Sequence, residues 1–365
     1  MKATQRLHEL GQSLWLDNIT RQMLDDGTLR RYIAEFSITG LTSNPSIFEA
    51  AIGQGNAYDA DIREKAAAGL SAEDVFTALA LDDLRRAADL FRPAFEASDG
   101  HDGWVSMEVS PLLADDSAAS LHAASQIHRE AGRDNLFVKI PGTPAGVIAI
   151  EEAIFAGVPI NVTLLFDWQQ YLASANAYLR GIERRLRAGL DPRVASVASV
   201  FVSRWDVAVK DSAPEHLRNQ LGIAVAGRAY QAYRKLLASP RWASLAAAGA
   251  RPQRLLWAST GSKDPAAPAT LYVDSLAAPD TIDTVPEKTL LAFAERDGNI
   301  QTMSDDGEDA NAMLARFAEA RIDVNALAQR LQQEGAAAFV KSWRALLQRV
   351  ADKATDARPS AASQS

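Results

Sequence analysis

Residues 135–141 read Asn-Leu-Phe-Val-Lys-Ile-Pro, an apolar stretch with a single lysine, Lys139, near its end. A short continuous apolar run is typical of a strand that is covered on both faces, as in a parallel sheet. A lysine at the end of such a strand loses solvation, which favours its neutral amine. A neutral amine can attack a ketone and form a Schiff base. The stretch therefore predicts a buried strand that carries a candidate nucleophile.

Seven further segments resemble this one, and helical patterns such as 72–91 and 168–188 separate them. The eight predicted strands are residues 14–18, 40–44, 104–110, 136–140, 160–166, 194–202, 255–260 and 271–274. Strands that alternate with helices indicate βαβ units with right-handed crossovers. Eight such units favour an α/β fold of the (β/α)8 TIM-barrel type. A doubly wound open sheet is the alternative, because a strand count does not distinguish a closed sheet from an open one.

The segment after the barrel pattern is rich in helix-forming residues. Residues 303–311 are predicted to be an acidic loop, and 312–351 to form two additional C-terminal helices broken near Gly335. Phe339 and Trp343 share one apolar stripe, which packs either over the barrel mouth or on the outer helices. We expect a single catalytic domain over residues 1–352 and a disordered tail over 353–365, which lacks apolar anchors.

Composition excludes several classes of protein. The chain of 365 residues has a net charge of −8, which argues against nucleic-acid binding through phosphates. It contains no cysteine, so thiolate nucleophiles and cysteine-bound zinc are excluded. The five histidines form no metal-ligand pattern, and no nucleotide-binding or serine-hydrolase motif occurs. No apolar run reaches about 18 residues and no signal-peptide core opens the chain, so we expect a cytoplasmic protein without a membrane segment.

Polar side chains recur at or near the ends of the predicted strands, where a barrel enzyme needs them. They are Asp17, Asn44, Glu108, Asn161, Thr163, Ser199 and Lys263. Glu108 lies within an apolar strand, and an ionised carboxylate there needs a partner, for which Lys139 is the candidate. Asn161 and Thr163 are two residues apart and so share one face of a strand. Three ionisable groups in apolar strands, Asp17, Glu108 and Lys139, are costly to bury without a function.

The ordered set of motifs resembles the transaldolase family, in its longer bacterial form. The matching stretches are LDN at 16–18, GLTSNPSIF at 40–48, SMEVS at 106–110, VKIP at 138–141, GVPINVTLLF at 157–166, SRWD at 203–206 and WASTGSK at 257–263. The resemblance implies a (β/α)8 barrel that transfers a dihydroxyacetone unit between phosphorylated sugars, with neither a metal nor an organic cofactor.

Catalytic roles carry over from the resemblance by position. Lys139 resembles the Schiff-base lysine of the family. Glu108 is similar to its acid–base, which works through a water held with Thr163. Asp17 resembles the residue that takes the proton of the sugar hydroxyl when the carbon–carbon bond breaks.

Binding roles follow in the same way. Asn44 and Asn161 are similar to the amides that orient the three-carbon intermediate, and Ser199, Arg204 and Lys263 match positions that receive the substrate phosphate. Shorter family members carry an arginine after the seventh strand, where this chain has Lys263 in an extended loop. A lysine neutralises phosphate as a point charge without the bidentate geometry of arginine.

Two other functions are compatible with the same residues. A related Schiff-base aldolase would release free dihydroxyacetone, but such relatives tend to lack the carboxylate at the position of Glu108. A barrel that binds phosphosugars without turnover would not require Asp17, Glu108 and Lys139 together. The sequence does not fix the oligomeric state, so a homodimer is left open.

Overall fold

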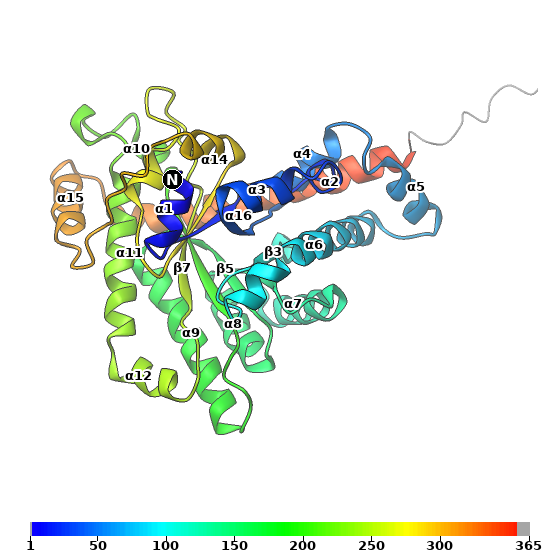
Figure 1. The fold of residues 1–365 in the computed structure, drawn as a ribbon, viewed down its shortest axis with the longest axis horizontal. Helices are drawn as coiled ribbons and strands as arrows, with labels where there is room; N and C mark the ends of the chain where they lie inside the picture. The colour runs from blue at the N-terminus through cyan, green and yellow to red at the C-terminus, as the bar shows by residue number, and fades with distance from the viewer. Residues whose placement is uncertain (1, 356–365) are drawn as a thin grey trace, which may run out of the picture.

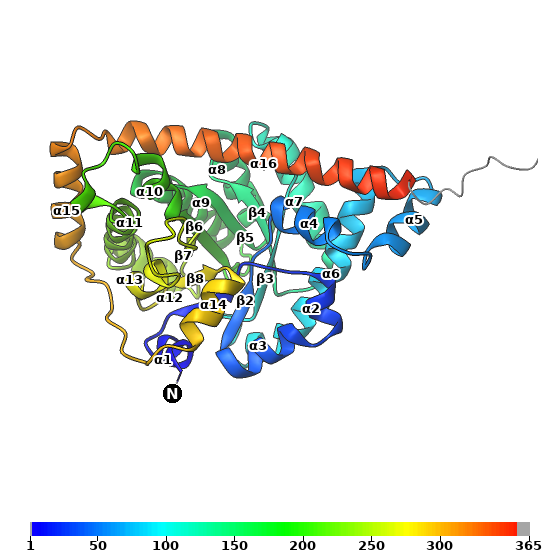
Figure 2. The ribbon, with the colours of Figure 1, turned by 90° about the horizontal axis from the view of Figure 1, so that it is seen from above.

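Eight parallel strands close into a barrel in the order of the chain. The computed structural model describes residues 2–355. The strands are β1 Ser13–Leu16, β2 Ile38–Leu41, β3 Trp104–Glu108, β4 Leu136–Pro141, β5 Ile160–Leu165, β6 Ser196–Phe201, β7 Arg254–Ala258 and β8 Ile282–Val285. Each strand pairs with its neighbours in parallel, and β8 closes on β1. Helices surround the strands (Figures 1 and 2). The predicted (β/α)8 barrel is confirmed, and the open sheet is wrong.

The helices cover the outside of the barrel and extend from it on one side. They are α1 Ala3–Glu9, α2 Arg21–Asp25, α3 Thr28–Phe36, α4 Pro45–Gly53, α5 Asp59–Ala67, α6 Ala72–Ala97, α7 Ser117–Ala131, α8 Pro144–Ala156, α9 Trp168–Arg187, α10 Ser203–Val209, α11 Leu221–Leu237, α12 Pro240–Ala247, α13 Leu271–Ser275, α14 Glu287–Ala294, α15 Glu308–Glu319 and α16 Val324–Thr355. Two 3-10 turns, η1 Pro111–Leu113 and η2 Glu215–Leu217, complete the set. None of these helices is long and apolar enough to cross a membrane.

The eighth predicted strand is wrong in position. Residues 271–274 lie in the short helix α13, and β8 lies further on at Ile282–Val285. A short apolar run does not by itself distinguish a strand from a buried helical turn. The true strand contains Asp283 and Thr284, both buried, so its apolar pattern is weak.

The C-terminal helices also differ from the prediction in their boundaries. α15 begins at Glu308, inside the predicted loop, and the break before α16 lies at residues 320–323. Gly335 is an interior residue of α16, which continues to Thr355. The predicted tail therefore begins within a helix, and its residues 356–365 lie outside the described part of the chain.

Helix α16 runs along the barrel mouth on the side of β4 and β5. Figure 2 shows it crossing the molecule from α15 to α5. Its Gln332 side chain donates hydrogen bonds to the carbonyl oxygens of Gly142, after β4, and Leu164, in β5. Further along, Trp343 packs edge-on against Phe76 of α6 with ring centroids 5.2 Å apart. The helix thus contacts both the barrel mouth and the outer helices, which the sequence analysis gave as alternatives.

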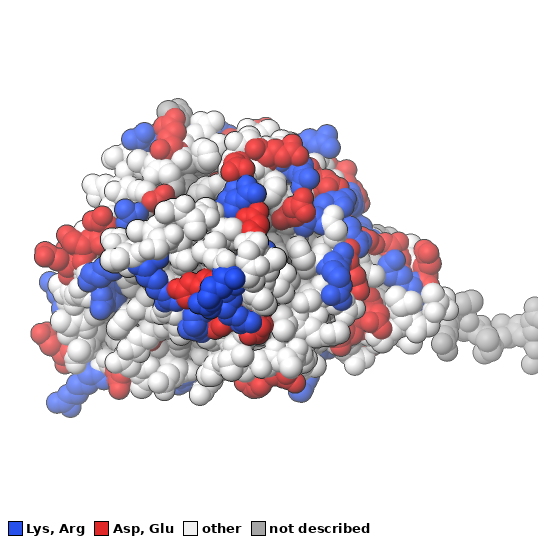
Figure 3. All heavy atoms as spheres, turned by 90° about the horizontal axis from the view of Figure 1, so that it is seen from below, with Lys and Arg blue, Asp and Glu red and all other residues white. Residues whose placement is uncertain are grey.

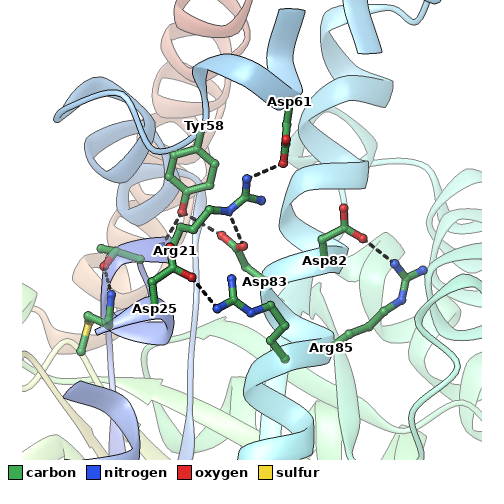
Figure 4. Close-up of polar contacts among 10 residues, drawn as sticks. Arg21, Asp25, Tyr58, Asp61, Asp82, Asp83 and Arg85 are labelled. Carbon is green, nitrogen blue, oxygen red and sulfur yellow. Dashed lines mark hydrogen bonds and ion pairs between the residues drawn. The ribbon is translucent and has the colours of Figure 1, made fainter. Parts of the chain in front are cut away.

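A buried charge network attaches α2 to the outer helices. Figure 4 shows Arg21 between Asp61 of α5 and Asp83 of α6, with the hydroxyl of Tyr58 beside Asp83. The guanidinium lies 2.5 Å from Asp61 and 2.9 Å from Asp83, and Tyr58 donates to Asp83 at 2.8 Å. Asp83 is fully buried, and burial raises its pKa while Arg21 opposes that shift. The network fixes the segment that follows β1.

Opposite charges are interspersed on the face shown in Figure 3, where Lys and Arg side chains lie beside Asp and Glu. Ion pairs join neighbouring helices. Arg184 of α9 pairs with Glu152 of α8, and Arg241 of α12 pairs with Glu183 of α9. This face of the molecule presents no broad positive area of the kind that binds a phosphate backbone.

Candidate active site

Lys139 and Glu108 form an ion pair inside the barrel. They are Cα partners on neighbouring strands β4 and β3, so both side chains point to the same face. Lys139 Nζ lies 3.2 Å from Glu108 Oε2 and donates to the carbonyl oxygen of Ser43 at 2.9 Å. The side chains are only 6% and 4% exposed. The lysine and the carboxylate that the sequence singled out are therefore direct partners in a site that is largely shielded from bulk solvent.

Glu108 has one oxygen on Lys139, and its other oxygen has no hydrogen-bond partner in the part of the chain that the structure describes. Burial raises the pKa of Glu108, and the positive charge of Lys139 opposes this shift. Among residues 2–355, Glu108 Oε1 and the hydroxyl of Thr163 are both buried and make no hydrogen bond. Thr163 lies on β5 opposite Pro141, two residues after Asn161. A carboxyl of raised pKa with an uncommitted oxygen is suited to accepting and donating protons.

Asp17 follows β1 and is held by Thr42, which directly follows β2. Its backbone N–H donates to the carbonyl of Val285, and its Oδ1 accepts from the hydroxyl of Thr42 at 2.7 Å. The Thr42 hydroxyl also lies 2.7 Å from that of Thr284 on β8. Burial raises the pKa of Asp17, while Thr42 and the charges of Lys139 and Lys263 oppose the shift.

The amide of Asn161 is held in one orientation by two serines. Ser199 of β6 donates to its oxygen at 2.7 Å, and its nitrogen donates to Ser106 of β3 at 3.1 Å. All three side chains are buried. Ser199 thus contacts Asn161 directly, and its predicted contact with phosphate stays a prediction. Ser106 was not singled out from the sequence, although it lies two residues before Glu108 and so shares its face.

Asn44 begins helix α4 and belongs to the rim of the site. Its side-chain oxygen accepts from the backbone N–H groups of Ser46 and Ile47, which caps the helix. The cap fixes the amide group and directs its nitrogen away from the helix. Asn44 lines a cavity of ≈ 690 Å³ together with Arg204 and Phe339. The cap and a role in binding are compatible, because they use opposite ends of the amide.

Arg204 of α10 lies beside two aromatic rings at the mouth, whose centroids are 6.4 Å apart. Its guanidinium carbon is 5.2 Å from the ring centroid of Phe201 and 5.8 Å from that of Phe339. Burial lowers the pKa of Arg204, and Glu108 opposes the shift. Asp206, two residues further on, is not its partner and accepts from Tyr272 and two backbone N–H groups. Within the part of the chain that the structure describes, Arg204 forms no ion pair.

Lys263 lies on the loop after β7 and is exposed at the mouth. It is near enough to Asp17 to lower that residue's pKa, so its charge acts on the same site. Ser259, directly after β7, has its hydroxyl 2.9 Å from that of Ser203. No group of three His, Asp or Glu side chains in residues 2–355 has a geometry that could hold a metal ion.

Comparison with known proteins agrees with this geometry. A family model described as "Transaldolase/Fructose-6-phosphate aldolase" matches residues 14–350. The chain is 43% identical to a protein named "Transaldolase" from Thermobifida fusca over 359 residues, which cover 96% of this chain and 97% of the relative. It is 42% identical to "Transaldolase" from Thiobacillus denitrificans, covering 96% and 100% of the two chains. The chain therefore belongs to the transaldolase/fructose-6-phosphate aldolase family.

Proposed function

We propose that this protein is a transaldolase, which moves a dihydroxyacetone unit from a ketose phosphate to an aldose phosphate through a Schiff base on Lys139. Sedoheptulose 7-phosphate or fructose 6-phosphate would be the donor, and glyceraldehyde 3-phosphate or erythrose 4-phosphate the acceptor. The observation that carries the proposal is the buried pair of Lys139 and Glu108, 3.2 Å apart inside the barrel. Family membership and near full-length similarity to transaldolases support the same activity.

Schiff-base formation needs a proton acceptor and then a proton donor. Lys139 must first lose a proton, and Glu108, which contacts its amine, would accept it. The neutral amine then adds to the ketone carbon of the donor. The resulting carbinolamine loses water when its hydroxyl is protonated, which leaves an iminium. The raised pKa of Glu108 suits both transfers. Its free oxygen and the free hydroxyl of Thr163 support the role of the pair in holding the water through which the proton moves.

Cleavage needs a base on the sugar hydroxyl next to the bond that breaks. Asp17 would take that proton, and the electron pair of the carbon–carbon bond would pass into the iminium to give an enamine. The aldose leaves, and the enamine keeps the three-carbon unit until an acceptor aldehyde reverses the steps. The raised pKa of Asp17 makes its carboxylate a stronger base than an exposed aspartate. Asn44 and Asn161 would orient the three-carbon unit, because each amide is already fixed by hydrogen bonds.

The donor phosphate would lie at the mouth, near Arg204 and Lys263. The C-terminal face of a parallel barrel is where such anion sites form. Arg204 has no competing ion pair in the described chain, and Lys263 is exposed to an incoming ligand. These two observations support phosphorylated sugars as the substrate class.

The second candidate is an aldolase that releases free dihydroxyacetone. The family includes both activities by its description. The buried carboxylate of Glu108 favours transfer, because aldolase relatives tend to lack it. Dihydroxyacetone released from fructose 6-phosphate would be measured with and without an aldehyde acceptor. Release at the same rate as transfer would identify the protein as an aldolase.

The proposed intermediate can be trapped directly. Borohydride added with fructose 6-phosphate should increase the intact mass by one reduced dihydroxyacetone unit, on the peptide that contains Lys139. Lys139→Arg keeps the charge but cannot form the imine, so it should fold, gain no adduct and show no turnover. An adduct on another lysine, or appreciable turnover by the arginine variant, would refute the mechanism.

A further inference from the structure

Three residues of α16 form a stripe that faces the barrel mouth. Gln332, Gly335 and Phe339 are spaced three and four residues apart, which places them on one side of a helix. Gln332 contacts the ends of β4 and β5, and Phe339 lies 6.4 Å from the ring of Phe201 at the end of β6. We call these three residues the mouth stripe. It lies over strands that carry the candidate nucleophile and its neighbours.

The position of α16 along its own axis is fixed by Gln332. Its amide nitrogen donates to the carbonyl of Gly142 at 3.1 Å and to that of Leu164 at 3.0 Å. Leu164 has a left-handed backbone with φ 57°, which a leucine adopts only where surrounding contacts hold it. The hydrogen bond is one of those contacts, and it joins α16 to the residue that follows Thr163.

The other two residues of the stripe approach Arg204. Gly335 leaves so little space that a Cβ added there would lie 3.0 Å from Leu164 Cδ2 and 3.2 Å from Arg204 Nη1. Phe339 presents its ring to the same guanidinium at 5.8 Å, next to Phe201, whose ring centroid is 5.2 Å from the guanidinium and 6.4 Å from that of Phe339. Arg204 is therefore in contact with α16 through a backbone surface and an aromatic ring.

These contacts restrict the conformation of the Arg204 side chain. An arginine side chain has many rotamers, so holding it in one of them costs conformational entropy. Arg204 has no ion pair in residues 2–355 to order it before a ligand arrives. Stacking a guanidinium on aromatic rings restricts its plane and leaves the N–H groups at its edge available to an oxyanion.

We propose that Phe339 and Gly335 are positioning residues, which hold the guanidinium of Arg204 ready for the phosphate of the substrate. The inference rests on the proposed function, since it assumes a phosphorylated substrate at Arg204. It adds that α16, a helix outside the eight βα units, forms part of the phosphate site. Phe339 itself is not in contact with the reacting atoms, so its loss should weaken binding and leave the chemistry unchanged.

The test compares Phe339→Leu with two variants. Phe339→Tyr keeps the aromatic face and should behave like the wild type. Trp343→Leu removes an aromatic ring from the same helix four residues further on, where it contacts Phe76 and not Arg204. For Phe339→Leu we expect a rise of about three- to tenfold in KM for fructose 6-phosphate, with kcat within about twofold. The inhibition constant of inorganic phosphate should rise by the same factor, and the KM of non-phosphorylated fructose should not change.

Gly335→Ala is a second test that does not depend on losing a core ring. Alanine favours the helix more than glycine does, but the added methyl group requires both Leu164 and Arg204 to shift by about a few tenths of an ångström. We expect a higher KM for fructose 6-phosphate in a protein that still unfolds cooperatively. An unchanged KM in both variants would overturn the proposal. Equal losses for phosphorylated and non-phosphorylated sugars, or a similar rise in Trp343→Leu, would overturn it as well.

Arg204→Ala distinguishes this inference from the proposed function. If Arg204→Ala weakens phosphate binding but Phe339→Leu and Gly335→Ala do not, only the positioning role is wrong. If Arg204→Ala leaves phosphate inhibition unchanged, the phosphate site itself is misplaced. Borohydride trapping on Lys139 tests the Schiff base independently of either result.

Discussion

Replacing Lys139 by methionine should destabilise the protein in a way that depends on pH. The substitution keeps an unbranched side chain of similar volume but leaves Glu108 without the ammonium group 3.2 Å away. Breaking a buried ion pair from one side costs about 3–5 kcal/mol, because the remaining charge is uncompensated. We expect the free energy of unfolding at pH 8 to fall by about 3 kcal/mol, the lower end of this range, because Glu108 can reduce the cost by binding a proton.

The direction of the pH effect follows from the pKa of Glu108. Burial already raises it above the ordinary value of 4.5, and removal of Lys139 removes the main opposing influence. A carboxyl whose pKa is raised in the folded state contributes stability below its unfolded pKa and loses that contribution as pH rises through the folded value. Lys139→Met should therefore lie closest to the wild type near pH 5 and fall further below it towards pH 8.

A double-mutant cycle with Glu108→Gln isolates the charge. The double variant has no buried charge at this position, so it should be more stable at pH 8 than Lys139→Met alone, and it should not develop the additional deficit that Lys139→Met shows between pH 5 and pH 8. Urea denaturation of the four proteins at pH 5 and pH 8 measures these differences in the free energy of unfolding. A deficit of Lys139→Met that is equal at both pH values, and unaffected by Glu108→Gln, would refute the account of the pair.

Three further predictions concern single groups. Asp17→Asn should permit borohydride trapping but block carbon–carbon cleavage, whereas Glu108→Gln should slow formation of the adduct; equal loss of trapping in both would contradict the division of roles. Arg204→Ala should chiefly raise KM for phosphorylated donors, as steady-state kinetics would show, and an equal loss with non-phosphorylated ketoses would make its role structural. Burial raises the pKa of Asp283 from 3.8 to about 8, so the wild type should lose stability relative to Asp283→Asn as pH rises between those values, by a few kcal/mol at most. Denaturation curves across this range would show a constant difference if Asp283 were ionised throughout.

The sequence predicted the barrel because seven of its strands are continuous apolar runs between turn residues. Such runs are buried on both faces, so their signal does not depend on contacts made elsewhere. The eighth strand was misplaced because Ile282–Val285 combines two apolar residues with Asp283 and Thr284. These polar side chains are buried by tertiary packing that the local pattern does not encode. Pro286, directly after the strand, and the Pro279–Asp280 pair before it were the available signals.

The same error hid part of the candidate site. Thr284 contacts the hydroxyl of Thr42, which in turn holds Asp17, so the orientation of the proposed base depends on β8 as well as on β1 and β2. A sequence motif identifies residues that are close along one strand, as with Asn161 and Thr163. It does not identify a support that arrives from another strand, as Ser106 and Ser199 do for the amide of Asn161.

Closure of the barrel explains why these cross-strand supports exist. Parallel register places Glu108 opposite Lys139, and Lys139 opposite Asn161, so one layer of side chains contains three polar groups from three strands. Each group lies where water is largely excluded, and each unpaired atom there carries a free-energy cost. Hydroxyl groups on neighbouring strands reduce that cost by forming hydrogen bonds. Glu108 Oε1 and the Thr163 hydroxyl form no such bond within residues 2–355. Hydrogen bonds from neighbouring strands and loops therefore order this layer, and the two atoms left without a bond, one in the layer and one on Thr163 beside it, are those that the proposed proton transfers require.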